Sequence, residues 1–204
     1  THDNGGFIGR VADYAATDYY TTVQQASAYE VANATHTNVS LATGTSQYNQ
    51  GVMFSADGTI VYFQNSTGTK FATLSTPSDL STASSLTTVS SGAANLQSIT
   101  FNSTGTRVYF ARYQSEIYFA DLTTAWDLTT KGSNTSFNVG ISALRSMKFN
   151  GDGTKLYLIK SGNIYSYPLA TAYTITSTDV LSSNRTAQSI TGGDQQGFRF
   201  NSDG

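Results

Sequence analysis

Apolar and polar residues alternate in short runs along most of this chain, and one pattern returns at a nearly constant interval. A phenylalanine is followed four positions later by a glycine in FSADG, FNSTG, FNGDG and FNSDG, which begin at Phe54, Phe101, Phe149 and Phe200. Successive glycines of this motif lie 47, 48 and 51 residues apart. A self-similar period of about 20 to 50 residues indicates a repeat architecture, so each motif belongs to a unit.

Each unit predicts a hairpin followed by a third strand. Before the turn, Val52 and Phe54 alternate with period two, as side chains on a strand do. After the turn, Val61 and Phe63 share one face while Tyr62 lies on the other. Both faces therefore carry large apolar groups and need cover, which neighbouring copies of the unit supply. Tyrosines in this register are assigned to packing between units, and they are Tyr62, Tyr109 and Tyr157.

The residues of the motif predict the turn itself. Asp-Gly tolerates positive φ and suits a tight hairpin. We assign a structural turn role to Asp57, Gly58, Gly105, Asp152, Gly153, Asp203 and Gly204. A calcium loop is the alternative, but each turn offers one carboxylate where such a loop needs several. No metal-binding residue is predicted.

The remaining segments complete the predicted units. Third strands are expected around 70–74, 116–122 and 163–169, each followed by a linker of one type, at 75–80, 123–128 and 170–175. The Ser/Thr-rich stretches 81–97 and 177–189 are loops or fourth, outer strands. Phe7 precedes Phe54 by 47 residues, so the first unit is a divergent copy. The units span 3–47, 48–94, 95–143 and 144–194, and residues 195–204 start a further unit, so we expect a piece of a longer chain.

Composition excludes several classes of function. The 204 residues carry a net charge of -2, with 12% charged and 12% aromatic side chains. This balance argues against a nucleic-acid-binding surface. The absence of cysteine excludes disulfides, thiolate zinc sites, iron–sulfur clusters and cysteine nucleophiles. No run approaches the ~18 apolar residues of a membrane span, so membrane insertion is not expected.

Candidate catalytic groups are sparse. His2 and His36 are the two histidines, and no G-x-S-x-G motif accompanies them. Glu30 and Glu116 stand at equivalent third-strand positions, which a recurrent solvent-facing site explains more simply than a glycosidase pair. We predict no catalytic residue and no cofactor, and therefore a protein that is not an enzyme.

Tyrosines outside the repeated register are candidates for a recognition surface, and they are Tyr19, Tyr20, Tyr113 and Tyr173. We select Tyr113 and Tyr173, together with Trp126, as the candidate recognition residues. Tyrosine offers a large contact area at low entropic cost. Asp121 and Asp127 flank Trp126, an arrangement in which a sugar could stack on the indole and bind the carboxylates. Packing of the linker is the alternative role of Trp126.

A unit of about 45 residues with three or four short strands is the sequence form of a β-propeller blade. The runs FSADGTIVYF, FNSTGTRVYFARYQSEIYFADLTTAWDLTT and FNGDGTKLYLIKSGNIYSYPLATAYTITS resemble the propeller repeats related to the WD40 and YVTN-lactonase types. Such repeats recur in phage virion and bacterial surface proteins. The Gly-His and terminal Trp-Asp pairs of true WD40 repeats are missing. The resemblance implies an all-β propeller with about four blades of three to four antiparallel strands, part of a larger ring.

The resemblance, the low charge and the absence of catalytic clusters lead us to expect a non-enzymatic structural or receptor-binding or glycan-binding module of a phage appendage such as a tail fibre. Its location would be the virion or the extracellular space, and its partners other virion or surface proteins, a host glycan or a host surface protein. A homo-oligomer is compatible with this expectation. One alternative is an extracellular bacterial or archaeal adhesin or filament subunit. A second is a lactonase-like or carbohydrate-active propeller enzyme, although no acidic residue flanks Phe54, Phe101 or Phe149.

Overall fold

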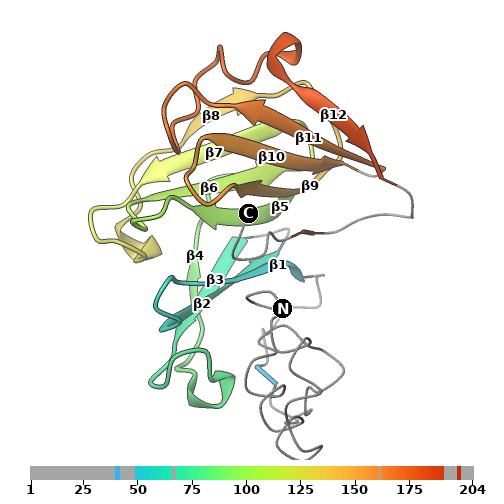
Figure 1. Cartoon of the computed structure of the whole chain (residues 1–204). Coiled ribbons are helices and arrows are strands. Elements are labelled where there is room, and N and C mark those ends of the chain that lie inside the picture. The colour runs from blue at the N-terminus through green and yellow to red at the C-terminus, as the bar shows by residue number, and fades with distance from the viewer. Residues whose placement is uncertain (1–39, 42–48, 66–67, 161, 191–196, 199–204) are drawn as a thin grey trace, which may run out of the picture. The chain divides into compact units, whose positions relative to one another are not determined.

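The computed structural model describes residues 40–41, 49–65, 68–160, 162–190 and 197–198 (Figure 1). By compactness the chain divides into Thr1–Val39 and Ser40–Gly204, and every described residue lies in the second unit. Almost all of the blade predicted at 3–47 and most of the one starting at 195 fall outside the described residues. The same holds for Asp203 and Gly204.

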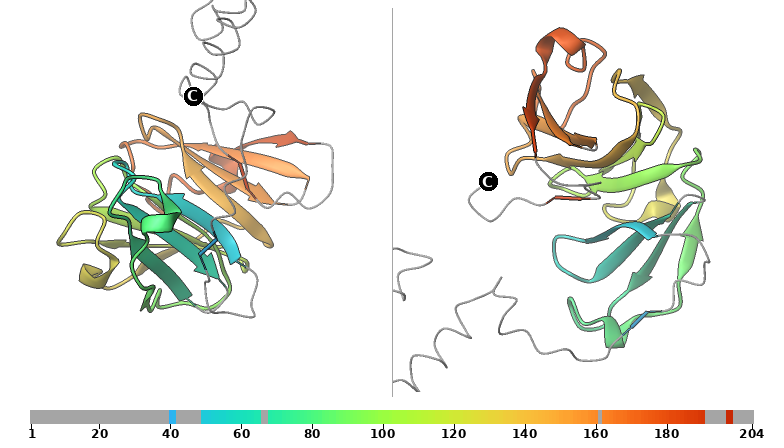
Figure 2. Two further views of the ribbon diagram at one scale, coloured as in Figure 1. Left: turned by 90° about the horizontal axis from the view of Figure 1, so that it is seen from below. Right: turned by 90° about the vertical axis from the view of Figure 1, so that its right-hand side faces the viewer.

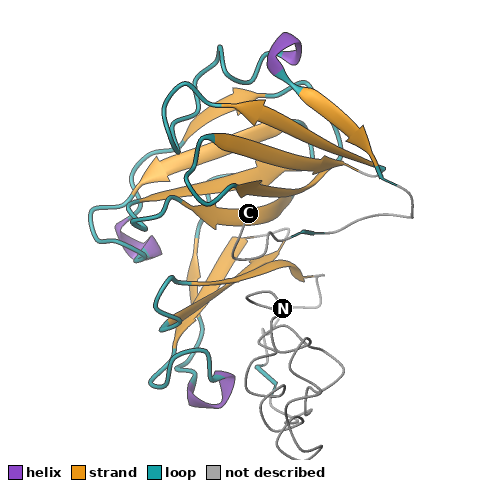
Figure 3. Ribbon diagram, in the orientation of Figure 1, coloured by secondary structure: helices purple, strands orange, loops and turns teal. Residues whose placement is uncertain are grey.

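Three four-stranded antiparallel sheets make up the described chain, and the strands of each sheet pair in chain order (Figures 1 and 3). The first sheet contains β1 (Asn49–Phe54), β2 (Ile60–Asn65), β3 (Gly68–Thr73) and β4 (Thr87–Val89). The second contains β5 (Leu96–Phe101), β6 (Arg107–Arg112), β7 (Glu116–Asp121) and β8 (Thr135–Asn138). The third contains β9 (Leu144–Phe149), β10 (Lys155–Lys160), β11 (Asn163–Pro168) and β12 (Thr186–Ser189).

In a β-propeller, each blade is a four-stranded antiparallel meander, and successive blades pack face to face. Figure 2 shows the three sheets following one another in chain order. The predicted all-β propeller fold is therefore confirmed for three blades. Each described sheet lies inside one predicted unit, the first within 48–94, the second within 95–143 and the third within 144–194.

Short 3-10 turns follow the third strand of each blade. They are η3 (Leu80–Thr82), η4 (Leu128–Thr130) and η5 (Ser182–Asn184), and side chains cap the first two. Asp79 accepts a hydrogen bond from the backbone N–H of Ser81 at 2.9 Å, and Asp127 accepts one from Thr129 at 2.9 Å. These bonds satisfy N–H groups that a turn start leaves unpaired. The Ser/Thr-rich stretches after the first and third linkers supply β4 and β12, the outer strands of their sheets.

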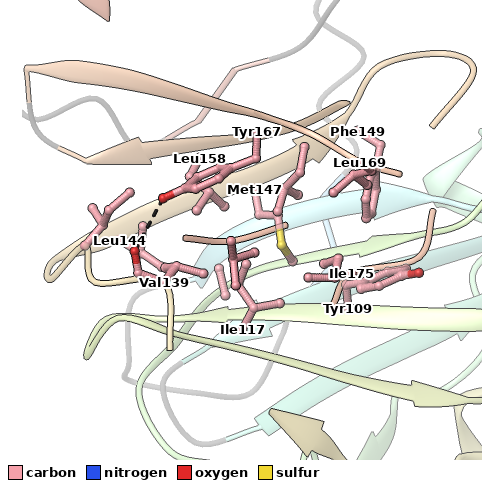
Figure 4. Close-up of a cluster of buried hydrophobic side chains, with 14 residues drawn as sticks. Tyr109, Ile117, Val139, Leu144, Met147, Phe149, Leu158, Tyr167, Leu169 and Ile175 are labelled. Carbon is pink, nitrogen blue, oxygen red and sulfur yellow. Dashed lines mark hydrogen bonds between the residues drawn. The ribbon is translucent and has the colours of Figure 1, made fainter. Parts of the chain in front are cut away.

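Apolar side chains from facing sheets form the core. Along β6, Val108 and Phe110 join the cluster with the first sheet, whereas Tyr109 and Ala111 join the cluster with the third. Period-two alternation produces this division because neighbouring residues of a strand point to opposite faces. Figure 4 shows the cluster between the second and third sheets, in which the Tyr167 hydroxyl donates to the Val139 carbonyl at 3.3 Å. The need for cover on both faces is thus met by adjacent blades.

A buried tyrosine joins each described blade to the next. The Tyr62 ring lies 4.9 Å from that of Phe101, and its hydroxyl donates to the backbone carbonyl of Trp126. The Tyr109 ring lies 4.8 Å from that of Phe149, and its hydroxyl donates to the carbonyl of Tyr173. Both tyrosines are fully buried, and burial raises the pKa of Tyr109 to about 12. We call this arrangement the tyrosine joint.

The turn between the first two strands of a blade differs from a tight two-residue hairpin. Five residues, Ser55 to Thr59, connect β1 to β2. Gly58, Gly105 and Gly153 have φ values of 73°, 71° and 74°, a conformation that glycine adopts without penalty. Asp57 and Asp152, the two turn aspartates that the structure describes, have no positive φ. The Asp57 carboxylate instead accepts hydrogen bonds from the Thr59 backbone at 3.0 Å and hydroxyl at 2.8 Å.

Acid should weaken the first turn. Hydrogen bonds from the Ser55 hydroxyl and from Thr59 lower the pKa of Asp57 from 3.8 to about 2. Between these values the unfolded chain binds a proton that the folded chain does not, so stability falls as pH drops from about 4 to about 2. Asp57→Asn should lose less stability across this interval than the natural chain, as measured by urea unfolding at several pH values. Identical pH slopes for the two proteins would contradict the assignment.

Candidate functional site

A groove of about 320 Å³ crosses the ends of the first strands of all three described blades. It exists because the repeat brings the last residues of β1, β5 and β9, and the turns that follow them, to the same end of successive sheets. The residues that line it are Met53, Phe54, Ala56, Thr100, Phe101, Asn102, Ser103, Trp126, Phe149, Asn150, Gly151 and Tyr173.

Trp126 and Tyr173 reach the groove from equivalent linker positions. Both have positive φ, 66° and 55°, and each donates its backbone N–H to the carbonyl of the turn glycine of its own blade, Gly105 or Gly153, at 2.8 Å. Their rings cover these glycines so closely that a Cβ on either would lie 2.2 Å from a ring carbon. The first blade has Ser78 at this position, with φ 62° and the same bond to Gly58. The turn glycine and the linker aromatic thus form one packed unit.

The aromatic walls are held by further ring contacts. The Trp126 ring lies 4.9 Å from that of Phe101, and the Tyr173 ring lies 5.2 Å from that of Phe149. The Tyr173 hydroxyl donates to the Gly151 carbonyl at 2.7 Å. Trp126 and Tyr173 are half-buried, so part of each side chain remains accessible. Tilted rings at these separations are a favourable geometry for aromatic pairs.

Two asparagines place amide groups on the groove wall in a defined orientation. Asn102 accepts the Arg107 backbone N–H at 3.0 Å and donates its amide to the Thr106 hydroxyl at 3.0 Å. Asn150 makes the same pair of bonds, with the Lys155 backbone at 2.8 Å and the Thr154 hydroxyl at 3.2 Å. An amide carries two N–H groups and two carbonyl lone pairs, so each asparagine keeps capacity for a ligand.

The groove lining contains no charged residue. Asp57 and Asp152 follow the lining residues Ala56 and Gly151 directly in sequence, and hydrogen bonds lower the pKa of each carboxyl. For Asp152, the largest cause is the Thr154 hydroxyl. The groove lining itself is therefore neutral, with two ionised carboxylates next to it in sequence.

A second, polar pocket of about 240 Å³ adjoins the groove and shares Asn102 and Tyr173 with it. Its main charged feature is the ion pair of Arg107 and Asp121, with Nε–Oδ1 at 2.5 Å and Nη2–Oδ2 at 3.0 Å. Arg107 holds the pKa of Asp121 below its usual value through this hydrogen bonding. The guanidinium also lies over the Phe119 ring, 5.0 Å from its centroid. Thr106 and Thr174 complete the polar wall.

The structure brings together two of the three predicted recognition residues. Trp126 and Tyr173 line the groove, whereas Tyr113 does not. Tyr113 is 39% exposed in the turn between β6 and β7, where the Arg145 guanidinium lies 5.1 Å from its ring centroid. Of the two aspartates that flank Trp126 in sequence, Asp127 caps η4. Asp121 lies in the adjoining polar pocket.

Sequence reasoning did not identify several groove residues as part of a site. Met53, Asn102 and Asn150 are direct neighbours of the repeated phenylalanines, and Ser103 follows Asn102; that repeated flank is the available signal. The predicted turn glycines Gly58, Gly105 and Gly153 are at the turns. The described residues contain no group of three or more His, Cys, Asp or Glu side chains placed to hold a metal. None of the helices among them is long and apolar enough to cross a membrane.

No family model matches the chain, and no curated protein matches it. Among solved structures, a chain of the crystal structure of a nidogen/laminin complex is similar, with a TM-score of 0.49 and 14% identity over 72% of this chain and 51% of that one. A functionally unknown protein from Desulfotomaculum acetoxidans DSM 771 has a TM-score of 0.42 and 15% identity over 58% of this chain and 37% of that one. The chain thus spans about half the length of the first of these structures.

Proposed function

We propose that this chain is a non-enzymatic recognition module whose groove binds a neutral glycan. The observation that carries the proposal is the joint presence of the half-buried Trp126 and Tyr173 and of two oriented asparagine amides in one uncharged groove. The C–H face of a sugar ring packs on an aromatic ring, and its hydroxyls bind amide groups. Binding sites generally combine apolar and aromatic walls with a few placed polar groups in this way.

Other ligand classes fit the groove less well. A wholly apolar ligand would cover the remaining N–H group and carbonyl lone pair of the Asn102 and Asn150 amides without hydrogen-bonding them, which costs free energy. A nucleic acid needs cationic side chains for its phosphates. The lining offers none, and the neighbouring Asp57 and Asp152 would repel phosphate. The same repulsion disfavours acidic sugars.

The setting we propose is an extracellular appendage, with a phage tail fibre or similar virion part as the first candidate. It rests on the resemblance to WD40-like and YVTN-lactonase-like repeats of virion and surface proteins. A bacterial or archaeal adhesin would use the same groove. Genes for portal, tail and baseplate proteins beside the encoding gene would favour the virion.

Blocking the groove tests the proposed function. Ser103 lines the groove and Thr104, the next residue, does not, while both are exposed. On an array of neutral and acidic glycans, the natural chain should bind neutral ones. Ser103→Arg should reduce that binding at least about tenfold, equivalent to about 1.4 kcal/mol. Thr104→Arg is the matched control and should change it less than about twofold.

Both variants should unfold at the temperature of the natural chain, because an exposed turn residue contributes little to packing. Failure of the chain to bind any neutral glycan, or equal losses in Ser103→Arg and Thr104→Arg, would refute the assignment of the groove.

A further inference from the structure

The polar pocket and the groove adjoin each other, since Asn102 and Tyr173 line both. Sites for small ligands commonly have volumes of about 300 to 1,000 Å³. The groove, at about 320 Å³, stands at the lower limit of this range, and the pocket, at about 240 Å³, falls below it. The combined volume of the groove and the pocket lies well within the range of small-ligand sites. A ligand longer than one sugar ring would therefore extend from one into the other past Tyr173.

Strand pairing, two hydrogen bonds and a ring contact hold the ion pair in the pocket. Arg107 begins β6 and Asp121 ends β7, and the two residues are direct partners in the antiparallel pairing of these strands. The pair uses two hydrogen bonds, at 2.5 and 3.0 Å, and the guanidinium is also held over the Phe119 ring. A bidentate arginine–carboxylate pair with an aromatic support has little conformational freedom to lose on binding.

The same pair remains open to a ligand. The Asp121 side chain is 69% exposed and the Arg107 side chain 26% exposed. A carboxylate has about four lone-pair sites and a guanidinium has five N–H groups, so both have unused capacity beside each other. Each hydroxyl of a sugar is both donor and acceptor. Two adjacent hydroxyls can therefore accept from Arg107 and donate to Asp121 at the same time, without a net charge on the ligand.

We infer that the Arg107–Asp121 pocket is a second subsite that binds vicinal hydroxyls, so that the ligand of this protein is a neutral glycan of at least two sugar rings. One ring occupies the aromatic groove beside Trp126, and the next reaches past Tyr173 to the ion pair. This inference rests on the proposed function, because it extends the ligand of the groove.

A comparison of short and long probes tests the inference. The probes are lactose, cellobiose, maltose and N,N′-diacetylchitobiose, each beside the methyl glycoside of its monosaccharide unit, and affinity is measured by isothermal titration calorimetry. The best disaccharide should bind at least about tenfold more tightly than its methyl monosaccharide. Asp121→Asn should remove most of that difference and leave the affinity for the methyl monosaccharide within about twofold.

Glu116→Gln is the matched control. Glu116 is a carboxylate of the same strand, β7, and pairs with Arg112 at the opposite end of the β6–β7 hairpin, away from the pocket. This variant should bind every probe as the natural chain does. Unfolding temperatures of both variants show whether a loss of binding comes from a loss of structure.

The outcomes separate the two proposals. If a monosaccharide binds and Ser103→Arg abolishes that binding, but the disaccharide gains nothing or Asp121→Asn behaves like Glu116→Gln, the second subsite is refuted while the groove stands. If none of the probes and none of the neutral glycans on the array binds, the proposed function itself is refuted, and the inference with it.

Discussion

Replacing Gly105 with alanine is expected to lower the free energy of unfolding by about 2 to 5 kcal/mol. Gly105 has a φ of 71°, a conformation that costs an L-residue about 1 to 2 kcal/mol. In addition, the new methyl group would lie 2.2 Å from the Trp126 ring, which packs against Phe101 and cannot retreat freely. Overpacking of this kind typically costs about 1 to 3 kcal/mol.

Gly140 supplies the matched control for this substitution. Its φ is 63°, and an added Cβ would meet no atom within 4 Å. Gly140→Ala therefore measures the backbone penalty alone, about 1 to 2 kcal/mol. Urea unfolding followed by circular dichroism gives both values. In a Trp126→Ala background, Gly105→Ala should cost no more than Gly140→Ala. If Gly105→Ala and Gly140→Ala lower the free energy of unfolding of the natural chain equally, the Trp126 ring over Gly105 adds nothing to the penalty.

Removing the Tyr109 side chain is expected to have the second large effect. Tyr109 is fully buried between the second and third blades, where its ring contacts Phe149 and its hydroxyl binds the Tyr173 carbonyl. Tyr109→Ala leaves a cavity and an unpaired carbonyl, and large-to-small aromatic substitutions in a core cost about 3 to 5 kcal/mol. Tyr109→Phe removes the hydroxyl alone and should cost about 1 to 3 kcal/mol.

Tyr157 is the equivalent residue of the third blade and the control for the tyrosine joint. It is half-buried, and its ring lies 6.3 Å from that of Phe198. Tyr157→Ala should therefore cost clearly less than Tyr109→Ala, as measured by urea unfolding. If the two substitutions cost the same, burial between the second and third blades is not what makes Tyr109 important.

Much of the fold could be predicted because its signals are local and repeated. The alternation around Phe101 specifies a strand, and Gly105 four residues later specifies the reversal, whatever the rest of the chain does. Repetition at 47 and 48 residues then shows that one blade is copied. The predicted tight Asp-Gly hairpin was wrong, because Asp57 serves as a hydrogen-bond acceptor and only Gly58 of this five-residue turn takes a positive φ.

The candidate site could be predicted only in part. Trp126 and Tyr173 were identified as aromatic residues outside the tyrosine register, whereas Tyr113, chosen by the same criterion, lies outside the groove. Trp126 and Tyr173 share the fourth position of their linkers, 123–128 and 170–175, whereas Tyr113 follows the second strand of its blade. The sequence shows this difference in position, but only the packing of neighbouring blades places the linker aromatics beside the strand ends of the groove.

The alternation of apolar and polar residues determined the order of strands and turns, and it showed that both faces of each sheet need apolar cover. The sequence could determine this much because side-chain alternation and turn formation depend on residues close together in the chain. Which surfaces remain open was decided by packing between blades. Met53, Ser103 and Asn150 come from three blades and share one groove only because the tyrosine joint brings their strand ends together. Contacts between residues some 50 positions apart depend on the stacking of whole sheets, and for that reason the groove and its polar neighbour belong to the tertiary structure.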